Sequence, residues 1–355
     1  MNLKRRQLLQ LTAAAASAPL LAGCSGDHDI TLDKRYPIGP FGADSTAEEV
    51  TEGIDLTGRV AMVTGCNSGL GYETMRVLAK RGAHVIGTGR TIEKAVEACT
   101  SVEGTTTPLM LDLSDFQTAI SCSAAVQMMG LAPDILVCNA GVNTFGDLEL
   151  IDGVEKHFVV NFLGHFVLVD RLVPGMVARG SGRIVHVSSR SAYKREPAEG
   201  IDFDNLRGEG EFDAMEAYGR SKLANALFSL ELARRLEGSG VTSNAVHPGL
   251  VQTNIVRTAP SFLKGAFNLF GGIIAKTPEQ GAATQVYVGT NPRLASVSGA
   301  YFEDCNPVQV SGDHHLNDRA MALRLWNFAE KITSDYLMSV DYSTPAGWLP
   351  RQTKA

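Results

Sequence analysis

Short apolar runs alternate with longer amphipathic runs from Leu56 almost to the end of the chain. This alternation is typical of βαβ units and predicts a parallel sheet with helices on its faces. We therefore expect one doubly wound α/β domain with about seven strands over residues 56–333. The expected strands are Val60–Thr64, His84–Thr88, Thr107–Leu111, Ile135–Cys138, Arg183–Val187, Thr242–Val246 and Gly299–Phe302. The expected helices cover residues 70–81, 92–99, 115–128, 152–178, 214–237, 277–289 and 316–332.

Residues 1–26 have the layout of a signal peptide, with Lys4-Arg5-Arg6 followed by an apolar run from Leu8 to Leu21. The arginine pair resembles a bacterial twin-arginine signal, and Leu21-Ala22-Gly23-Cys24 resembles a lipobox in which Cys24 is lipidated. We expect an exported lipoprotein that faces the periplasm or cell surface and contacts the membrane only through its N-terminus. The alternative is a leader that stays attached to a cytoplasmic protein.

The remaining terminal segments are a polar stretch at 27–55, expected to be a linker, and a C-terminal extension at 334–355. The formal net charge of −6 and the lack of a basic stripe argue against a nucleic-acid partner. The cysteines after the leader are widely spaced, and neither Cys-x-x-Cys nor His-Glu-x-x-His occurs. We therefore expect no metal site and no disulfide framework.

A glycine-rich segment, Thr64-Gly65-Cys66-Asn67-Ser68-Gly69-Leu70-Gly71, follows the first expected strand and opens the first expected helix. Glycines there let the backbone approach a pyrophosphate, and the helix N-terminus supplies N–H donors. This context favours a dinucleotide site, although a glycine turn without a ligand would have the same pattern.

Together with Asn139-Ala140-Gly141 and the single Tyr218-x-x-x-Lys222, this segment resembles the short-chain dehydrogenase/reductase family over roughly residues 56–330. The resemblance implies a Rossmann-type fold and a nicotinamide cofactor. It departs from many relatives at Cys138, where they have another Asn. The cofactor contacts that it implies are Gly65, Asn67, Ser68, Gly69, Leu70, Gly71, Asp112, Leu113, Asn139, Ala140, Gly141, Tyr218, Lys222, Pro248, Gly249, Val251 and Thr253.

The second expected strand indicates which cofactor binds. A site specific for NAD usually ends this strand with an acid that contacts the ribose 2′-hydroxyl. Here the strand continues into Gly89-Arg90 without an acid. Arg90 could instead pair with the 2′-phosphate of NADP, so NADP is expected and NAD is less favoured. Arg90 could also be an ordinary cation beside a helix.

Hydride transfer to a carbonyl needs a proton donor at the oxygen, and Tyr218 supplies a phenol for it. Lys222 lies one helical turn later on the same face, where its charge would lower the pKa of the phenol. By family resemblance, Ser189 hydrogen-bonds the substrate oxygen, with Ser188 as the alternative. The resemblance also makes Asn161 part of a proton relay that leads to Lys222.

The charged insert Arg190–Ala217, with later Ser298–Cys305, resembles the retinol-dehydrogenase and WW-domain-oxidoreductase branch of the family. That branch implies lipophilic alcohols or carbonyls, and the apolar segment 261–274 occupies the position of a substrate loop. We expect an NADP(H)-dependent oxidoreductase that acts on a small lipophilic molecule, either as a monomer or as a homo-oligomer. The alternative is a non-catalytic dinucleotide sensor or scaffold with the same fold.

Overall fold

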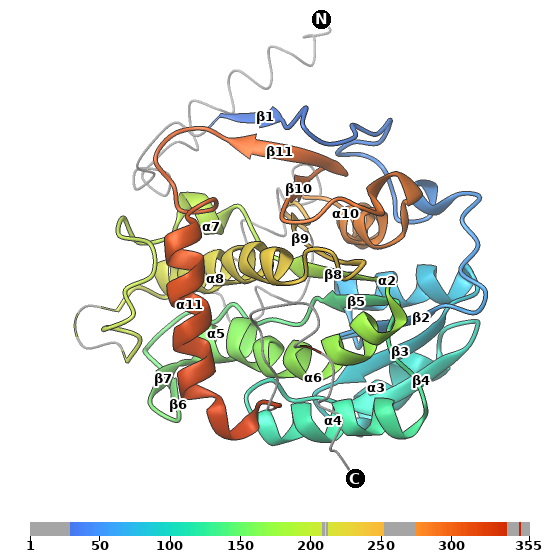
Figure 1. The fold of residues 1–355 in the computed structure, drawn as a ribbon, viewed down its shortest axis with the longest axis horizontal. Coiled ribbons are helices and arrows are strands. Elements are labelled where there is room, and N and C mark those ends of the chain that lie inside the picture. Colours follow the sequence, from blue (N-terminus) through green and yellow to red (C-terminus); the bar gives the residue numbers. More distant parts are fainter. Residues whose placement is uncertain (1–28, 208–209, 211, 252–274, 339–347, 349–355) are drawn as a thin grey trace, which may run out of the picture.

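One nine-stranded sheet forms the centre of the molecule (Figure 1). The computed structural model describes residues 29–207, 210, 212–251, 275–338 and 348. The strands lie in the order β1-β11-β10-β9-β8-β5-β2-β3-β4. Their bounds are β1 Ile30–Leu32, β2 Val60–Val63, β3 His84–Gly89, β4 Thr106–Met110, β5 Ile135–Cys138, β8 Gly182–Val187, β9 Val241–His247, β10 Tyr301–Glu303 and β11 Asn306–Val310.

The seven strands from β10 to β4 pair in parallel, and each expected strand is confirmed within two residues. The sheet therefore has the doubly wound, Rossmann-type order: β3 and β4 are added on one side of β2, and β5, β8 and β9 on the other, so the strand order reverses between β2 and β5. Such a switch point leaves a crevice outside the carboxyl ends of the strands, where ligands bind in this fold. The two antiparallel strands β11 and β1 extend one edge and were not expected from the sequence.

Helices cover both faces of the sheet and bury a separate apolar cluster on each side (Figure 1). One cluster includes residues of α2, α3 and α10, and the other residues of α4, α6, α8 and α11. The helix bounds are α2 Gly69–Lys80, α3 Ile92–Thr100, α4 Phe116–Met128, α5 Lys156–Phe158, α6 Gly164–Arg179, α7 Ser191–Lys194, α8 Ala214–Arg235, α10 Pro278–Thr290 and α11 Arg319–Ile332. Short 3-10 turns lie at η1 Glu49–Thr51, η4 Pro292–Leu294 and η5 Ser334–Tyr336.

The helix expected at 152–178 begins later, at Lys156, because a small hairpin precedes it. Its strands β6 Leu150–Ile151 and β7 Val154–Glu155 are joined by Asp152-Gly153, and both turn residues have positive φ. Asp-Gly is a strong signal for this two-residue turn, and the sequence prediction overlooked it.

Within the described residues, only the helical segment Lys156–Arg179 is long and apolar enough to cross a membrane. In its most apolar 18-residue stretch, 89% of the residues are buried inside the fold, as in the core helix of a globular domain.

The expected linker at 27–55 is wrong for the part that the structure describes. The arm from residue 29 pairs β1 with β11, and the Ala47 N–H donates to the Glu279 carbonyl at 2.8 Å. Ala47, Val50 and Thr51 are buried at 0 to 2% exposure. These side chains pack against α10, so burial overrides the polar composition of the segment.

The C-terminal extension also contributes to the core instead of only lying on the surface. Trp348 is fully buried, and its ring packs edge-on against Trp326 of α11 at a centroid distance of 6.2 Å. Nearer the domain, the Met338 N–H donates to the Asp170 carboxylate at 2.7 Å. The extension therefore ties α11 to α6.

Candidate active site

The segment after β2 has the backbone geometry of a tight turn. Gly65 and Gly69 have φ of +72° and +59°, in the left-handed region that favours glycine. A Cβ on Gly71 would lie 2.2 Å from the Gly65 carbonyl oxygen, so no larger residue fits. Ser68 precedes α2 without a side-chain cap, which leaves the N-terminal N–H groups of this helix to another partner. Asn67 and Ser68 are exposed beside them.

The residues after β5 are hydrogen-bonded directly to this turn. The Asn139 side-chain amide donates to the Thr64 carbonyl at 2.9 Å, and its oxygen accepts a hydrogen bond from Gln285 at 3.3 Å. The Thr64 hydroxyl accepts N–H bonds from Asn139 and Ala140, both at 2.9 Å. The next residue, Gly141, is packed tightly against Asn161: a Cβ at this position would lie 3.0 Å from the side-chain oxygen of Asn161.

The two neighbouring strand ends carry the residues expected at the adenosine end of a cofactor. Arg90, directly after β3, is exposed and makes no hydrogen bond or ion pair within the described ranges of the chain. Asp112 follows β4, and its carboxylate accepts two hydrogen bonds from Ser114. Leu113 beside it is buried. The structure thus brings both positions to the carboxyl edge that carries the glycine turn.

On the other side of the switch point, β9 ends at His247 and continues into Pro248-Gly249. Gly249 has φ of +93°, and Val251 forms an isolated parallel bridge with Lys276. A Cβ on Gly281 of α10 would lie 2.6 Å from both Val251 and Leu70, so this segment packs against the start of α2. Thr253 and the expected substrate loop at 261–274 lie outside the described residues.

Tyr218 and Ser189 meet where α8 passes the end of β8. The Ser189 side chain lies close enough to Tyr218 to lower the pKa of its phenol, and the Tyr301 hydroxyl donates to the Ser189 carbonyl at 2.9 Å. The Ser188 hydroxyl instead donates to the Lys222 carbonyl at 2.7 Å and is buried. The geometry therefore favours Ser189 over Ser188 as the serine that faces a substrate oxygen.

Burial dominates the ionisation of the Tyr218–Lys222 pair. Desolvation raises the pKa of Tyr218 to about 12, although the hydrogen bond from Ser189 works against the rise. Desolvation also lowers the pKa of Lys222 to about 8. Lys222 Nζ lies 5.7 Å from the Tyr218 ring centroid and donates to the Val187 carbonyl at 3.0 Å. The expected lowering of the Tyr218 pKa by Lys222 is thus not seen, because burial of the phenol outweighs the nearby charge.

Asn161 lies in a π-helical turn, η2 Val159–Leu163, between α5 and α6. Such turns are rare and frequently occur at functional sites. The side-chain oxygen of Asn161 accepts the Val142 N–H at 2.7 Å. Its amide nitrogen donates to the Val142 carbonyl at 3.0 Å and to the Ser221 hydroxyl at 2.9 Å. Asn161 therefore joins the loop after β5 to α8, between Tyr218 and Lys222.

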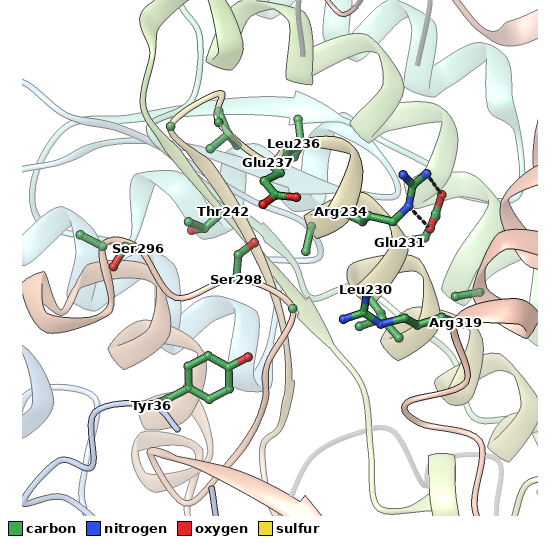
Figure 2. Close-up of a pocket in the computed structure, with 17 residues that line it drawn as sticks. Tyr36, Leu230, Glu231, Arg234, Leu236, Glu237, Thr242, Ser296, Ser298 and Arg319 are labelled. Carbon is green, nitrogen blue, oxygen red and sulfur yellow. Dashed lines mark hydrogen bonds and ion pairs between the residues drawn. The ribbon is translucent and has the colours of Figure 1, made fainter. Parts of the chain in front are cut away.

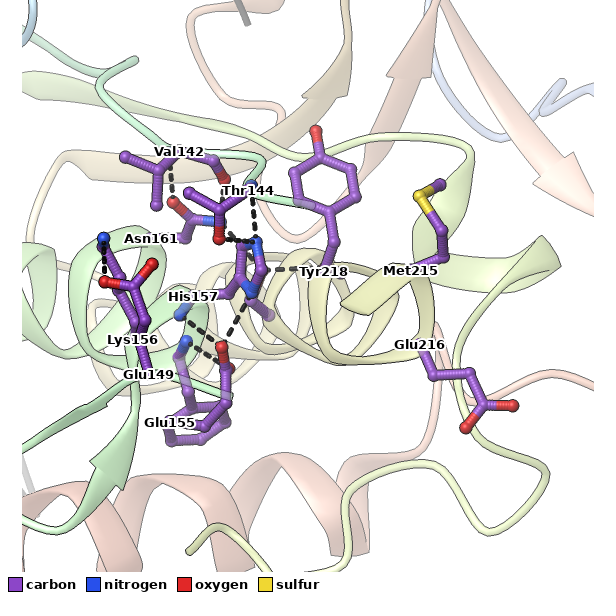
Figure 3. A network of polar contacts seen from close by, with 12 residues as sticks. Val142, Thr144, Glu149, Glu155, Lys156, His157, Asn161, Met215, Glu216 and Tyr218 are labelled. Atoms are coloured by element: carbon purple, nitrogen blue, oxygen red, sulfur yellow. Dashed lines mark hydrogen bonds and ion pairs between the residues drawn. The ribbon is translucent and has the colours of Figure 1, made fainter. Parts of the chain in front are cut away.

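A buried His157–Glu155 pair lies beside Tyr218 and was not expected from the sequence (Figure 3). The Thr144 N–H donates to His157 Nε2 at 2.9 Å, so the ring proton is on Nδ1 and bonds Glu155 at 2.7 Å. Burial raises the pKa of Glu155, but its bonds to His157 outweigh burial and hold the pKa below the usual value. The His157 ring packs edge-on to Tyr218 at 6.0 Å. The sequence offered one weak signal for this pair, since Glu155 and His157 are polar residues directly before an apolar helical run.

A second unexpected cluster supports Ser189 from the side of β10. The Arg190 guanidinium pairs with the buried carboxylate of Glu303, which also accepts a hydrogen bond from the Tyr193 hydroxyl at 3.2 Å. The Arg190 N–H donates to His247 Nδ1 at 3.3 Å. Burial lowers the pKa of His247 to about 3, so its ring stays neutral and serves as an acceptor.

A surface cavity of about 500 Å³ lies at the opposite end of β9 from this site (Figure 2). β9 runs from Val241, which lines the cavity, to His247, a distance of roughly 20 Å at about 3.3 Å per residue. The cavity therefore does not belong to the site. Among the cavity's lining residues are Tyr36, Glu231, Arg234, Glu237, Ser298 and Arg319.

Within the described residues, no cluster of His, Cys, Asp or Glu could hold a metal ion, either in this cavity or elsewhere.

Comparison with known proteins is consistent with this geometry. The short chain dehydrogenase family model matches residues 59–201. Human retinol dehydrogenase 11 is 39% identical over 78% of this chain and 86% of its own length. Human WW domain-containing oxidoreductase is 35% identical over 84% of this chain and 74% of its own length. A solved structure from Beutenbergia cavernae, with NADP bound at low occupancy, has a TM-score of 0.55 and 27% identity, covering 70% of this chain and 96% of that one.

Proposed function

The chain belongs to the short-chain dehydrogenase/reductase family, and from that premise we propose an NADP(H)-dependent enzyme that interconverts a lipophilic alcohol and its carbonyl compound. The observation that carries the proposal is the convergence of Tyr218, Ser189 and Lys222 beside the glycine turn. These side chains come from the start of α8 and the end of β8, and they meet at the carboxyl edge of the parallel sheet.

The residues at the switch point fit a dinucleotide. A Cβ on Gly71 would collide with the Gly65 carbonyl, and the start of α2 has no side-chain cap among the described residues, so its N–H groups can donate to a pyrophosphate. Arg90 is an exposed cation that has no ion-pair partner among the described residues, and it stands where NAD-specific sites carry an acid, which supports NADP over NAD. The bound cofactor would supply or accept a hydride. The other residues proposed to hold it are Asn67, Ser68, Leu70, Asp112, Leu113, Asn139, Ala140, Pro248 and Val251.

In this proposal the Tyr218 phenol exchanges a proton with the substrate oxygen, and the Ser189 hydroxyl orients that oxygen. Because the pKa of Tyr218 is about 12, the phenol is protonated at neutral pH and ready to donate during carbonyl reduction. Lys222 would support the tyrosinate that donation leaves, since it is the nearest cation on the same helix face. Asn161 holds the loop that closes the site behind Lys222.

Two features support a lipophilic substrate. Retinol dehydrogenases are among the relatives that match most of this chain. Met215 lies one helical turn before Tyr218 at the start of α8 and is half-buried (Figure 3). Methionine is flexible and polarizable, so it adapts to irregular apolar ligands.

We also propose export, based on the arginine pair at 5–6, the apolar run at 8–21 and Cys24. All of these residues lie outside the described ranges. Mass spectrometry of the protein from a bacterial host would test the proposal. A mature chain that starts at a diacylated Cys24 supports it, and an intact Met1 overturns it.

Fluorescence titration of the full chain with NADPH and NADH tests the main proposal, followed by a panel of lipophilic and polar carbonyls. We expect selective NADPH binding and turnover of lipophilic aldehydes or ketones. Cofactor binding without turnover of any carbonyl would favour a sensor over an enzyme. Failure to bind either dinucleotide would mean that the glycine turn has been misinterpreted.

A further inference from the structure

His165, in the first turn of α6, is a fully buried histidine that the proposed chemistry does not use. Its side chain is 1% exposed. The ring nitrogen Nε2 lies 2.9 Å from the Thr64 hydroxyl, at the start of the glycine turn. The other ring nitrogen, Nδ1, lies 3.1 Å from the backbone carbonyl oxygen of Asn161. One imidazole therefore contacts both Thr64, at the glycine turn, and Asn161, which is hydrogen-bonded to the helix that carries Tyr218.

The hydrogen bonds around Thr64 fix which nitrogen of His165 carries the proton. The Thr64 hydroxyl oxygen accepts two N–H bonds, from Asn139 and Ala140. Its single proton has two acceptors in reach, His165 Nε2 at 2.9 Å and the Val137 carbonyl at 3.5 Å. The shorter bond goes to Nε2, so Nε2 is an acceptor and Nδ1 carries the hydrogen. Nδ1–H then donates to the Asn161 carbonyl.

A neutral ring is required for both bonds, since a protonated Nε2 could not accept from Thr64. Burial, helped by the charge of Lys222, lowers the pKa of His165 to about 4, despite the opposing bond to the Asn161 carbonyl. The imidazole therefore keeps one donor and one acceptor throughout the physiological pH range.

The line of hydrogen bonds continues from Asn161 to the helix that carries the proposed proton donor. The Asn161 amide donates to the Ser221 hydroxyl at 2.9 Å, and that hydroxyl donates to the Tyr218 carbonyl at 2.8 Å. Thr64, His165, Asn161, Ser221 and Tyr218 thus form one continuous path through buried groups, from β2 to α8.

We propose that His165 is a positioning residue, whose neutral imidazole sets the distance between the glycine turn and the Tyr218 helix by binding Thr64 and Asn161 at once. The inference rests on the proposed function, because it assumes that a dinucleotide binds at the turn and that Tyr218 reacts. It assigns His165 no contact with the substrate.

His186 offers a matched control. Like His165, it is 1% exposed. It lies on strand β8, and its ring packs edge-on against Phe228 with a centroid distance of 4.9 Å. Within the described residues, His186 Nε2 has no hydrogen-bond partner. Replacing either histidine with phenylalanine removes a buried imidazole, but only His165→Phe breaks the path.

The test is a double-mutant cycle in the full chain, with NADPH affinity and steady-state turnover as readouts. His165→Phe should weaken NADPH binding by about tenfold in the wild-type background and by less than about twofold in a Thr64→Val background. It should also lower kcat by about tenfold with substrate KM within about twofold, whereas His186→Phe should change each value by less than about threefold. His165→Gln keeps one donor and one acceptor and should recover most of the loss.

Two results would overturn the inference while leaving the proposed function intact. One is equal losses for His165→Phe and His186→Phe, and the other is the same loss from His165→Phe with and without Thr64→Val. If the wild-type chain binds no dinucleotide, the proposed function fails and the inference fails with it. Should His165→Phe not fold, as judged by circular dichroism, His165→Gln in the two backgrounds carries the same cycle.

Discussion

The turn after β2 and the start of α8 lie at the same edge of the sheet and differ in how they meet solvent. The glycine turn is partly exposed, with Asn67 and Ser68 on the surface and free N–H groups at the start of α2. Tyr218 and Lys222 are buried at 8% and 3% exposure. The geometry of the turn depends on glycines that have no side chain, whereas the helix places ionisable groups where water is scarce.

The two regions are therefore under different physical constraints. At the turn, adding one methyl group to Gly71 would collide with backbone, so the constraint is steric and independent of pH. At α8, burial shifts the pKa values of Tyr218 and Lys222 away from their ordinary values, so the constraint is electrostatic and depends on pH. Each prediction below affects one side of this comparison while leaving the other intact.

The largest expected effect is loss of turnover in Tyr218→Phe. The variant keeps the ring but removes the proton, so kcat should fall by a factor of about 1000 or more, while NADPH affinity stays within about twofold. Steady-state kinetics and fluorescence titration measure the two quantities. Tyr36→Phe, at the cavity beyond the other end of β9, is the matched control and should retain activity. Normal turnover in Tyr218→Phe would remove the tyrosine from the mechanism.

Lys222→Met should make the chain more stable and inactive. The folded state lowers the pKa of Lys222 from 10.5 to about 8, so burying its charge costs on the order of 3 kcal/mol at pH 7. The Val187 carbonyl keeps its bond from Asn225 at 3.2 Å. Below pH 8 the lysine is charged in both states and the cost is full, and between pH 8 and 10.5 the folded state loses its proton first, so the cost fades.

Urea unfolding at pH 7 and pH 10 checks this prediction. The gain in unfolding free energy of Lys222→Met over wild type should be large at pH 7 and small at pH 10. The exposed Lys94→Met should show no such difference. A gain that is equal at both pH values would mean that desolvation of the lysine is not its cause.

Gly71→Ala should lose NADPH affinity by at least about 100-fold, or about 2.7 kcal/mol, because its Cβ would displace the Gly65 carbonyl and the turn around it. Gly42→Ala is the control, since a Cβ there meets nothing within 4 Å. Fluorescence titration of both variants tests the steric constraint. Unchanged affinity in Gly71→Ala would show that the dinucleotide does not contact this turn.

Arg90→Asp should have the smallest effect and only on cofactor choice. Loss of the guanidinium should weaken NADPH by about tenfold and NADH by less than about twofold, since only NADPH carries the 2′-phosphate. Lys331→Asp on α11 makes the same charge reversal far from β3 and should leave both affinities unchanged. Equal losses for the two cofactors would exclude Arg90 from the 2′-phosphate contact.

Local patterns predicted the parallel sheet well. Each parallel strand is a short apolar run, and the motifs that follow β2, β5 and β8 converge because parallel strands share one carboxyl edge. The expected cofactor and catalytic positions that the structure describes all lie at this edge or on the helices beside it. Their roles in binding and catalysis remain predictions.

What the sequence did not predict depends on contacts between distant residues. β1 and β11 are held by pairing across nearly the whole chain, with Ile30 opposite Val310. His165 and His157 look like ordinary polar residues in an apolar run until Thr64 and Thr144 are brought beside them. The pKa of Tyr218 was expected to fall because spacing shows its neighbouring charge but not how deeply the phenol is buried.

The pairing of β1 with β11 bears on how this protein can be shortened. The family match begins at residue 59, so a truncation at that point would look harmless. It would instead strip the outer strand from the sheet and uncover the N–H and C=O groups of β11, along with the part of α10 against which Ala47 and Val50 pack. An unpaired sheet edge is a template for pairing between molecules. The arm therefore covers the backbone of β11 with a short three-residue strand, and any shortened version should begin before Asp29.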